Sequence, residues 1–531
     1  MSLTDREILE LNELCNSLVD DNLTRSDLAR LEQWIAKSDD ARKFYVRAMG
    51  QSASLGHYAS ELQIEAPDLA SPVGNIFHHT KWIWLALAAS VVVGALWFVS
   101  PTPSDRSDPS ELVEYVAKVT GVKSESSGNL IESRLGAFLS RGERFELLQG
   151  FAEITFDSGA VLVVEGPALL DVNSPWDATL HEGAITASVP SQAIGFRITN
   201  PAVEVVDLGT EFSMVADGKG AANVFVIQGE VEAVPGSNSD KEAILLHENE
   251  SRRFSVSGAS EVEVSQPSAI HSEIPNSFER GANSAKYIYW TLDERSGSVL
   301  GARSAGFLPE DYDLTLGKRA SGSAHTEGFR NGGLRFDGRT YAKASFPGLS
   351  SNLPRTVGFW VQVPKDAALS EAYSMVAWRA DSAKLGSRPV HIGWNRNPDE
   401  GPLGALRTDF SGGHAMGMTS LRDGLWHYVS IVFVPGIDPD APVQVKQYVD
   451  GKLESSRVTP GPKLSIAARG KESGDPSLAD VLWLGCRLGS SGPRKTRFRG
   501  ALDELIITDR ALDPSEISRL MDGQEIALPT L

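Results

Sequence analysis

The sequence predicts a multidomain protein with a small all-α head, one transmembrane helix and two all-β domains. Apolar residues repeat at helical spacing near the start of the chain, an uncharged apolar run follows at 82–99, and short alternating strands separated by glycine turns fill the rest. At 531 residues the chain is too long for one hydrophobic core. We therefore expect several domains.

The charge of the chain excludes one class of partner. There are 69 acidic and 50 basic residues, which gives a net charge of −19. A nucleic-acid binder needs a basic surface because it must neutralise phosphates. We therefore expect no nucleic-acid partner.

The head is expected over residues 1–65, as a short bundle of amphipathic helices. Thr24 and Asp27 form a plausible capping pair at the start of its second helix. The apolar face of that helix either packs within the bundle or leaves a groove for a partner helix, since so small a bundle is marginally stable. The partner-binding candidates on this face are Leu28, Leu31, Trp34 and Ile35.

A linker over 66–81 leads to WIWLALAASVVVGALWFV at 82–99, which contains no charge. As a helix, eighteen residues rise about 27 Å, nearly the thickness of a hydrocarbon core. Tryptophans stand at both ends of the run, and Pro101 stops the helix just beyond it. The alternative is a buried core helix. A cleaved signal peptide is not expected, because about eighty residues precede the run.

The flanks of this segment predict its orientation. Lys81 precedes it, whereas Asp105 and Asp108 follow it, so the head is expected in the cytoplasm. The protein would then be a single-pass protein of the cell (inner) membrane with periplasmic or extracellular β domains. Cys15 and Cys486 fall on opposite sides and cannot pair, so the exported part is expected to fold without disulfides.

A linker over 100–112 precedes the first β domain, expected at 113–265. Strands alternate with turns such as Asp157-Ser158-Gly159, and the glycines are best explained as turn positions with positive φ. Asp207 and Glu211 flank a glycine turn and have no nucleophile or histidine motif beside them. They are therefore predicted to be structural.

Four stretches in this order resemble a FecR-type domain: GERFELLQGFAEITFDSGAVLVVEGPALLDV, LHEGAITASVP, FRITNPAVEVVDLGTEF and VFVIQGEVEAV. The head stretch LTRSDLARLEQWIAKSDDARKFYVRAM resembles the N-terminal part of anti-sigma-type membrane regulators. The resemblance implies that the chain carries an external signal to a sigma factor. One branch of that family has a zinc-binding His and Cys motif in the head, but here Cys15 is alone, so no zinc site is predicted.

A third linker over 266–282 leads to the second β domain, expected at 283–525. Its strands alternate with period two, and Asp450-Gly451 is a typical hairpin turn. Near its end, Asp513, Pro514 and Glu516 supply an N-cap, a first-turn proline and a capping carboxylate. A short helix is expected there.

This domain resembles the LamG-like concanavalin A jelly roll, through YWTLDE, FDG, GFWVQ, DGLWHYVSIVF, YVDGK and FRGALDELIITDRALDPSEI in that order. The resemblance implies a sandwich that binds glycans or proteins. Some such domains use calcium, but the sequence offers no support for it here, and no cofactor or metal is predicted. The ligand-binding candidates, in a middle region where we expect loops, are Trp378, His391 and Trp394; a core role is the alternative for the two tryptophans.

An enzymatic role is not predicted. A glycoside hydrolase needs two carboxylates a few ångströms apart, commonly on one strand face, and no E-x-D-x-E run occurs. Asp503 and Glu504 are adjacent, so on a regular strand they would point to opposite faces. No catalytic residue is therefore assigned.

Three functions remain. The favoured one is a single-pass signalling regulator that binds a sigma factor through its head and an external glycan or protein through its β domains. The alternatives are a surface-anchored binding protein without regulatory output and a carbohydrate-active enzyme. The capped helices expected in the head favour the first, since an anchor alone does not need them.

Overall fold

The computed structural model describes Arg30 and, with gaps, residues 113–524. The described ranges are 113–123, 134–236, 243–257, 260–262, 278, 286–306, 312–317, 324–345, 354–370, 373–378, 389–410, 413–435, 443–458, 481–489 and 492–524. Residues 106–531 form one compact unit, which contains both β domains.

The predicted fold class needs correction. Over the described residues the protein is almost wholly β, with one α-helix, α5 (Pro514–Met521). The all-α head predicted for 1–65 and the transmembrane helix predicted for 82–99 are not among the elements seen. Both predictions lie outside the described residues, Arg30 excepted. Within the described ranges, no helix has the length and apolar character needed to cross a membrane.

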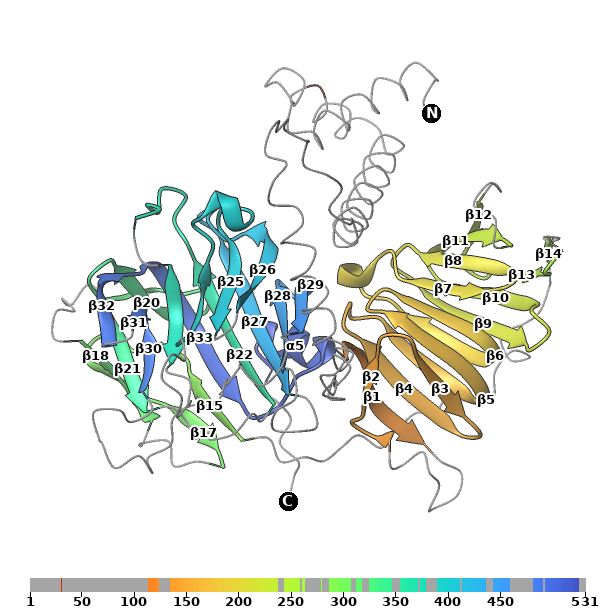
Figure 1. The fold of residues 1–531 in the computed structure, drawn as a ribbon, viewed down its shortest axis with the longest axis horizontal. Helices are drawn as coiled ribbons and strands as arrows, with labels where there is room; N and C mark the ends of the chain where they lie inside the picture. Colours follow the sequence, from red (N-terminus) through yellow and green to blue (C-terminus); the bar gives the residue numbers. More distant parts are fainter. Residues whose placement is uncertain are drawn as a thin grey trace, which may run out of the picture. The chain divides into compact units, whose positions relative to one another are not determined.

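The first domain is a 14-stranded β structure in which the central strand order is β12-β11-β8-β7-β6-β5-β4-β1-β2 (Figure 1). Its neighbouring strands pair antiparallel, except that β6 and β7 are parallel. The strands are β1 (Tyr115–Lys123), β2 (Phe138–Ser140), β3 (Glu143–Leu147), β4 (Phe151–Phe156), β5 (Val161–Ser174), β6 (Asp177–Ser188), β7 (Arg197–Asn200), β8 (Val203–Asp207), β9 (Glu211–Asp217), β10 (Ala222–Gln228), β11 (Glu230–Pro235), β12 (Ile244–His247), β13 (Ser251–Phe254) and β14 (Ser260–Val262).

Alternation of side chains explains these strands. In β8, Val203, Val205 and Asp207 point inward while the residues between them are half-buried. Asp207 is buried, and its carboxylate accepts hydrogen bonds from the amides of Gly209 and Thr210 at 2.6 and 3.0 Å. Gly209 has φ +99°, which favours glycine. Asp207 thus caps a turn, the structural role that the sequence indicates.

The second domain is a sandwich of two antiparallel sheets, the back sheet and the front sheet. The back sheet has the order β17-β15-β33-β22-β27-β28-β29, with β20 and β19 beside β33. The front sheet has the order β16-β18-β21-β30-β23-β24-β25-β26. A separate pair is formed by β31 and β32.

The back-sheet strands are β15 (Tyr287–Trp290), β17 (Arg303–Ala305), β19 (His325–Glu327), β20 (Gly332–Asp337), β22 (Arg355–Gln362), β27 (Trp426–Pro435), β28 (Val443–Val449), β29 (Lys452–Val458) and β33 (Arg499–Thr508). The front-sheet strands are β16 (Val299–Leu300), β18 (Leu314–Leu316), β21 (Ala342–Ser345), β23 (Ser374–Trp378), β24 (Val390–Trp394), β25 (Ala405–Phe410), β26 (Gly413–Ser420) and β30 (Val481–Leu484). The separate pair is β31 (Cys486–Gly489) and β32 (Gly492–Arg497).

Between the two sheets lies one hydrophobic core, in which Trp290, Trp378 and Trp394 are at most 1% exposed. A second, smaller cluster covers the outer face of the back sheet. There Ile517 of α5 packs with Trp360, Tyr428 and Tyr448. The predicted capping box is confirmed, because Asp513 accepts from the amide of Glu516 at 3.0 Å and Glu516 accepts from that of Asp513 at 3.0 Å.

Candidate ligand-binding face

The three residues predicted to meet a ligand lie in strands, not loops. Trp378 in β23 and Trp394 in β24 face the core and are 0% and 1% exposed. A ring buried to this extent presents no face to a sugar, so the expectation that these two tryptophans contact a ligand is corrected. His391 alternates with the core-facing Val390 and Ile392, so it lies on the outer side of the front sheet, 5% exposed. The partner-binding candidates Leu28, Leu31, Trp34 and Ile35 lie outside the described residues.

Strand register places His391 in a row that crosses the front sheet. Its Cα partners are Ala377 on β23 and Asp409 on β25. Asp409 pairs in turn with His414 on β26, and Ala377 pairs with Trp483 on β30. Because cross-strand partners share a face, these five residues lie on the outer side of the front sheet, which we call the front face. Ala377 and His391 are buried there.

A polar network runs along this face. Arg407, two residues before Asp409 on the same strand, donates from Nε to Asp409 Oδ1 at 2.7 Å. It also forms a short ion pair with Glu400. The Tyr373 hydroxyl donates to the other oxygen of Asp409. Burial beside Asp409 raises the pKa of Tyr373 above its ordinary value, so the hydroxyl keeps its proton.

Two further guanidinium groups approach the same tyrosine. Arg396 and Arg487 each lie 5.3 Å from the centroid of the Tyr373 ring. Such cation–π contacts hold an aromatic ring in place. Arginine, carboxylate and aromatic groups are therefore gathered around Tyr373.

His391 is a neutral part of this arrangement. Its Nε2 accepts a hydrogen bond from the amide of Leu488 at 3.0 Å, so the proton of the neutral ring lies on Nδ1. Burial lowers the pKa of His391 to about 4. The ring therefore carries no charge near neutral pH, and it supports the Tyr373 ring in an edge-on contact with centroids 6.2 Å apart.

Groups of the kinds found on the front face can form hydrogen bonds with a polyhydroxylated ligand. Guanidinium groups donate hydrogen bonds, carboxylates accept them, and sugar hydroxyls do both. The half-buried indole of Trp483, paired with Tyr341 at 5.8 Å, adds an aromatic surface for the apolar side of a sugar ring.

The sequence analysis did not identify Trp483 as a candidate. The local pattern indicates the orientation of Trp483, because Leu482 and Leu484 on either side of it face the core. The residue between two inward leucines on a strand must point outward. Tyr373, Arg407 and Asp409 carried no sequence motif and could be found only through strand pairing.

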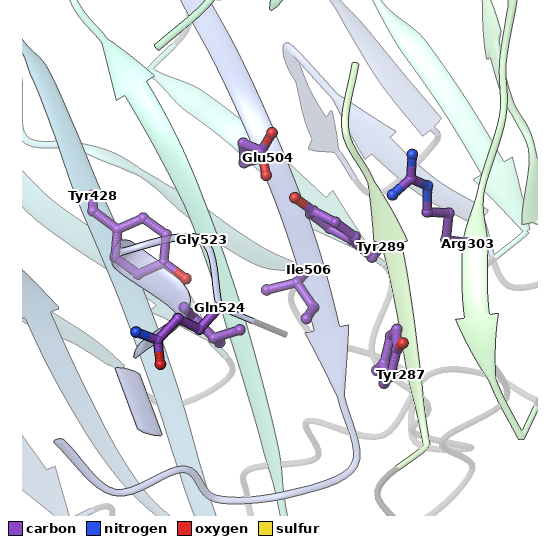
Figure 2. A pocket seen from close by; sticks show the side chains of 9 residues that line it. Tyr287, Tyr289, Arg303, Tyr428, Glu504, Ile506, Gly523 and Gln524 are labelled. Atoms are coloured by element: carbon purple, nitrogen blue, oxygen red, sulfur yellow. The ribbon is translucent and has the colours of Figure 1, made fainter. Parts of the chain in front are cut away.

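A small pocket lies on the other side of the sandwich, at the outer face of the back sheet (Figure 2). It has a volume of about 50 Å³, room for a few waters but far below the several hundred Å³ typical of ligand pockets. Its lining residues are Tyr287, Tyr289, Arg303, Tyr428, Glu504, Ile506, Leu520, Gly523 and Gln524. It is too small to hold a sugar ring.

Glu504, which lines this pocket, does not point where the sequence predicts. Asp503 and Glu504 do not point to opposite faces, because the pairing of β22 with β33 shifts register between Gly358 and Trp360. In this β-bulge Glu504 has φ +54°, while Leu502 and Leu505 both face the core. Both carboxylates therefore lie on the outer side. Asp503 is 0% exposed and accepts from the amide of Arg330 at 2.9 Å, so it holds a turn rather than facing a substrate.

Among the described residues, no group of three or more His, Cys, Asp or Glu side chains is placed to hold a metal ion.

Two protein families match the chain. The FecR protein family matches residues 145–232, and a laminin G family of the concanavalin A-like lectin/glucanases superfamily matches residues 336–518. The expected combination of a FecR-type region and a C-terminal LamG-like domain is confirmed. Among curated proteins, no sequence matches this chain.

Several solved structures resemble parts of the chain at low scores. Domain 4 of AbnA, a GH43 extracellular arabinanase from Geobacillus stearothermophilus solved with arabinotriose, is 19% identical over 45% of this chain and 99% of that one, with a TM-score of 0.31. A structure from Parabacteroides distasonis, named a putative anti-sigma factor, is 16% identical over 23% of this chain and 59% of that one, with a TM-score of 0.20. A Trypanosoma rangeli sialidase is 10% identical over 70% and 68%, with a TM-score of 0.29. Likeness at these scores supports no inference about function.

Proposed function

We propose that the protein is a signalling regulator whose jelly roll binds an extracytoplasmic glycan on its front face and whose FecR-type domain relays binding to a sigma factor. The pairing of a FecR region with a LamG-like domain in one chain supports a regulator that binds a ligand. The observation that carries the ligand assignment is the network of Tyr373, Arg407 and Asp409 on the front face.

A glycan fits this network better than an apolar ligand. The groups around Tyr373 include both donors and acceptors, and they are oriented by one another. Preorganised side chains lose little entropy when a ligand binds, which favours specificity for a polar ligand. A protein ligand rich in hydroxyl and amide groups is the second candidate.

The sigma-factor partner and the cellular location belong to this proposal. The resemblance of the FecR-type domain to regulators of sigma factors supports both, with the β domains outside the cytoplasm. Residues 1–65 would then contact the sigma factor. No catalysis is proposed, and the burial of Asp503 supports this choice.

Two measurements on the full chain test the proposal. The first is retention of the purified protein on a printed glycan array, which should identify at least one glycan class. The second is co-purification of a sigma factor encoded in the same genome, which should be lost when Leu31 and Trp34 are both replaced by Ala. If neither a glycan nor a sigma factor is retained, the regulator model fails.

Hydrolysis of a retained glycan would instead favour the enzymatic alternative. Reducing-sugar release by the purified protein measures it. We expect no release above background.

A further inference from the structure

Strand β28 of the back sheet contacts the core between the sheets, the front sheet and the FecR-type domain. Its side chains alternate, so Val443, Val445 and Val449 enter the core between the sheets. Gln444, Lys446 and Tyr448 point to the outer side of the back sheet, whereas Gln447 points inward. One strand therefore presents polar groups both to the core and to the outside.

On the outer side, Gln444 clamps the first strand of the FecR-type domain. Its Oε1 accepts from the amide of Tyr115 at 2.9 Å, and its Nε2 donates to the carbonyl of the same residue at 2.8 Å. These bonds satisfy both backbone groups of Tyr115. A side chain of the jelly roll thus continues the backbone pairing of β1.

Lys446 adds an ion pair to this clamp. Its Nζ lies 2.6 Å from Asp157 Oδ2 and donates to Oδ1 at 2.8 Å. Lys446 and Asp157 are 3% and 6% exposed, so both charges are removed from water. A buried charge whose partner is removed is strongly destabilised, which makes this contact specific. Gln444, Lys446, Tyr115 and Asp157 together are called the latch.

On the inner side, Gln447 crosses the apolar core to the front sheet. Its Nε2 donates to Thr408 Oγ1 at 2.7 Å, and both residues are 0% exposed. Thr408 lies between Arg407 and Asp409, the residues of the front-face network. Its side chain points inward while theirs point outward. The bond thus begins directly beneath the proposed ligand site.

We propose that β28 transmits the ligand signal, because it holds the front face from inside through Gln447 and the FecR-type domain from outside through the latch. This inference rests on the proposed function, which places the ligand on the front face. A buried hydrogen bond is costly to leave unmade, so a shift of β25 at Thr408 is passed to Gln447. The adjacent Lys446 then moves relative to Asp157.

The amide of Tyr115 provides a direct readout of the latch. Its hydrogen-bond acceptor is the side chain of Gln444, so its hydrogen exchange reports whether the two domains are docked. The experiment measures exchange at Tyr115 in the full chain at single-residue resolution. The variants are Lys446→Met, which breaks the ion pair, and Thr408→Val, which removes only the inner hydroxyl.

We expect Lys446→Met to accelerate exchange at Tyr115 about tenfold and Thr408→Val about threefold, although Thr408 touches neither Tyr115 nor Asp157. The matched controls are Lys343→Met on β21 and Thr199→Val on β7, which should leave the rate unchanged. If Thr408→Val does not fold, Gln447→Asn, which shortens the inner side chain, replaces it.

Each other outcome overturns the proposal. An unchanged rate in Lys446→Met means that the domains are not latched in solution. An accelerated rate in Lys446→Met with an unchanged rate in Thr408→Val means that the latch exists but does not communicate with the front sheet. No ligand or sigma factor enters this measurement, so its failure is distinguishable from failure of the proposed function.

Discussion

The two outer faces of the jelly roll differ in what their aromatic residues do. On the back sheet, Trp360 is 6% exposed and stacks on Phe329 with centroids 3.4 Å apart, and it shares a cluster with Tyr428, Tyr448 and Ile517 of α5. On the front sheet, Tyr373 is surrounded by Arg396, Arg487 and Asp409. One face uses its aromatics to pack other elements, and the other uses them within a polar network.

The two faces of the sandwich therefore differ in role: one packs against other elements, and the other carries the proposed ligand site. The back face is covered by α5 and latched to the FecR-type domain, so its residues are committed to packing. The front face carries the partly exposed side chains of Arg407 and Asp409, and substitutions there should affect the proposed binding more than folding. Mutations on the back face should therefore reduce stability more than binding, and mutations on the front face should reduce binding more than stability.

The largest expected effect is on the back face. Trp360→Ala removes a buried indole and should lower the free energy of unfolding by about 3–5 kcal/mol, measured by urea denaturation followed by circular dichroism. Trp483→Ala on the front face is the matched control, and it should cost about 1 kcal/mol because its ring is only half-buried. Equal losses would remove the distinction between the faces.

A smaller effect concerns Glu504, whose pKa burial raises from 4.5 to about 7. Because the folded state holds this proton more tightly than the unfolded state, stability should fall as pH rises from about 4.5 through 7. Glu504→Gln should therefore stabilise the protein at pH 8 by about 1–2 kcal/mol and leave pH 4 nearly unchanged. Urea unfolding at both pH values checks this.

Asp503, whose pKa is also raised to about 7 by burial, should retain part of the pH dependence in that variant. If Glu504→Gln loses the pH dependence of stability completely, Glu504 alone causes that dependence. A variant less stable than the wild type at pH 8 would show that the ionised Glu504 is stabilised by Arg330, 3.9 Å away, more than burial destabilises it.

The smallest effect lies outside the jelly roll, at an exposed pair of the FecR-type domain. The hydrogen bonds from Arg144, at 2.7 and 2.9 Å, are the main cause that lowers the pKa of Asp171 to about 2. Arg144→Met should raise that pKa toward its ordinary value, as followed by carboxyl carbon NMR. The stability this pair contributes is present above about pH 4 and is lost as pH falls through 2. Because Arg144 is exposed, the melting temperature near pH 7 should barely change.

The sequence predicted those features that depend on neighbours along the chain. Asp513, Pro514 and Glu516 predicted the start of α5, because capping involves residues three apart. Strand alternation and the family motifs predicted both β domains. The sequence failed where a strand departs from regular pairing, as at the bulge that turns Glu504 outward.

It also failed where function depends on which strands pair. Trp394 looked available because its segment was expected to be a loop, yet in β24 it alternates into the core. Arg407 and Asp409 become a site only when β25 pairs with β24 and β26. The latch between Lys446 and Asp157 joins residues almost three hundred positions apart, a separation of 289 that no local pattern encodes.

The proposed function depends most on the assignment of the ligand to the front face. The direct measurement is retention of the full chain on a printed glycan array for the wild type, Arg407→Ala and Arg499→Ala. Arg499 is a matched control on the back sheet, where it pairs with Asp366 at 3.1 Å. We predict that the wild type and Arg499→Ala bind the same glycans and that Arg407→Ala loses them. Equal binding by all three proteins would contradict the assignment.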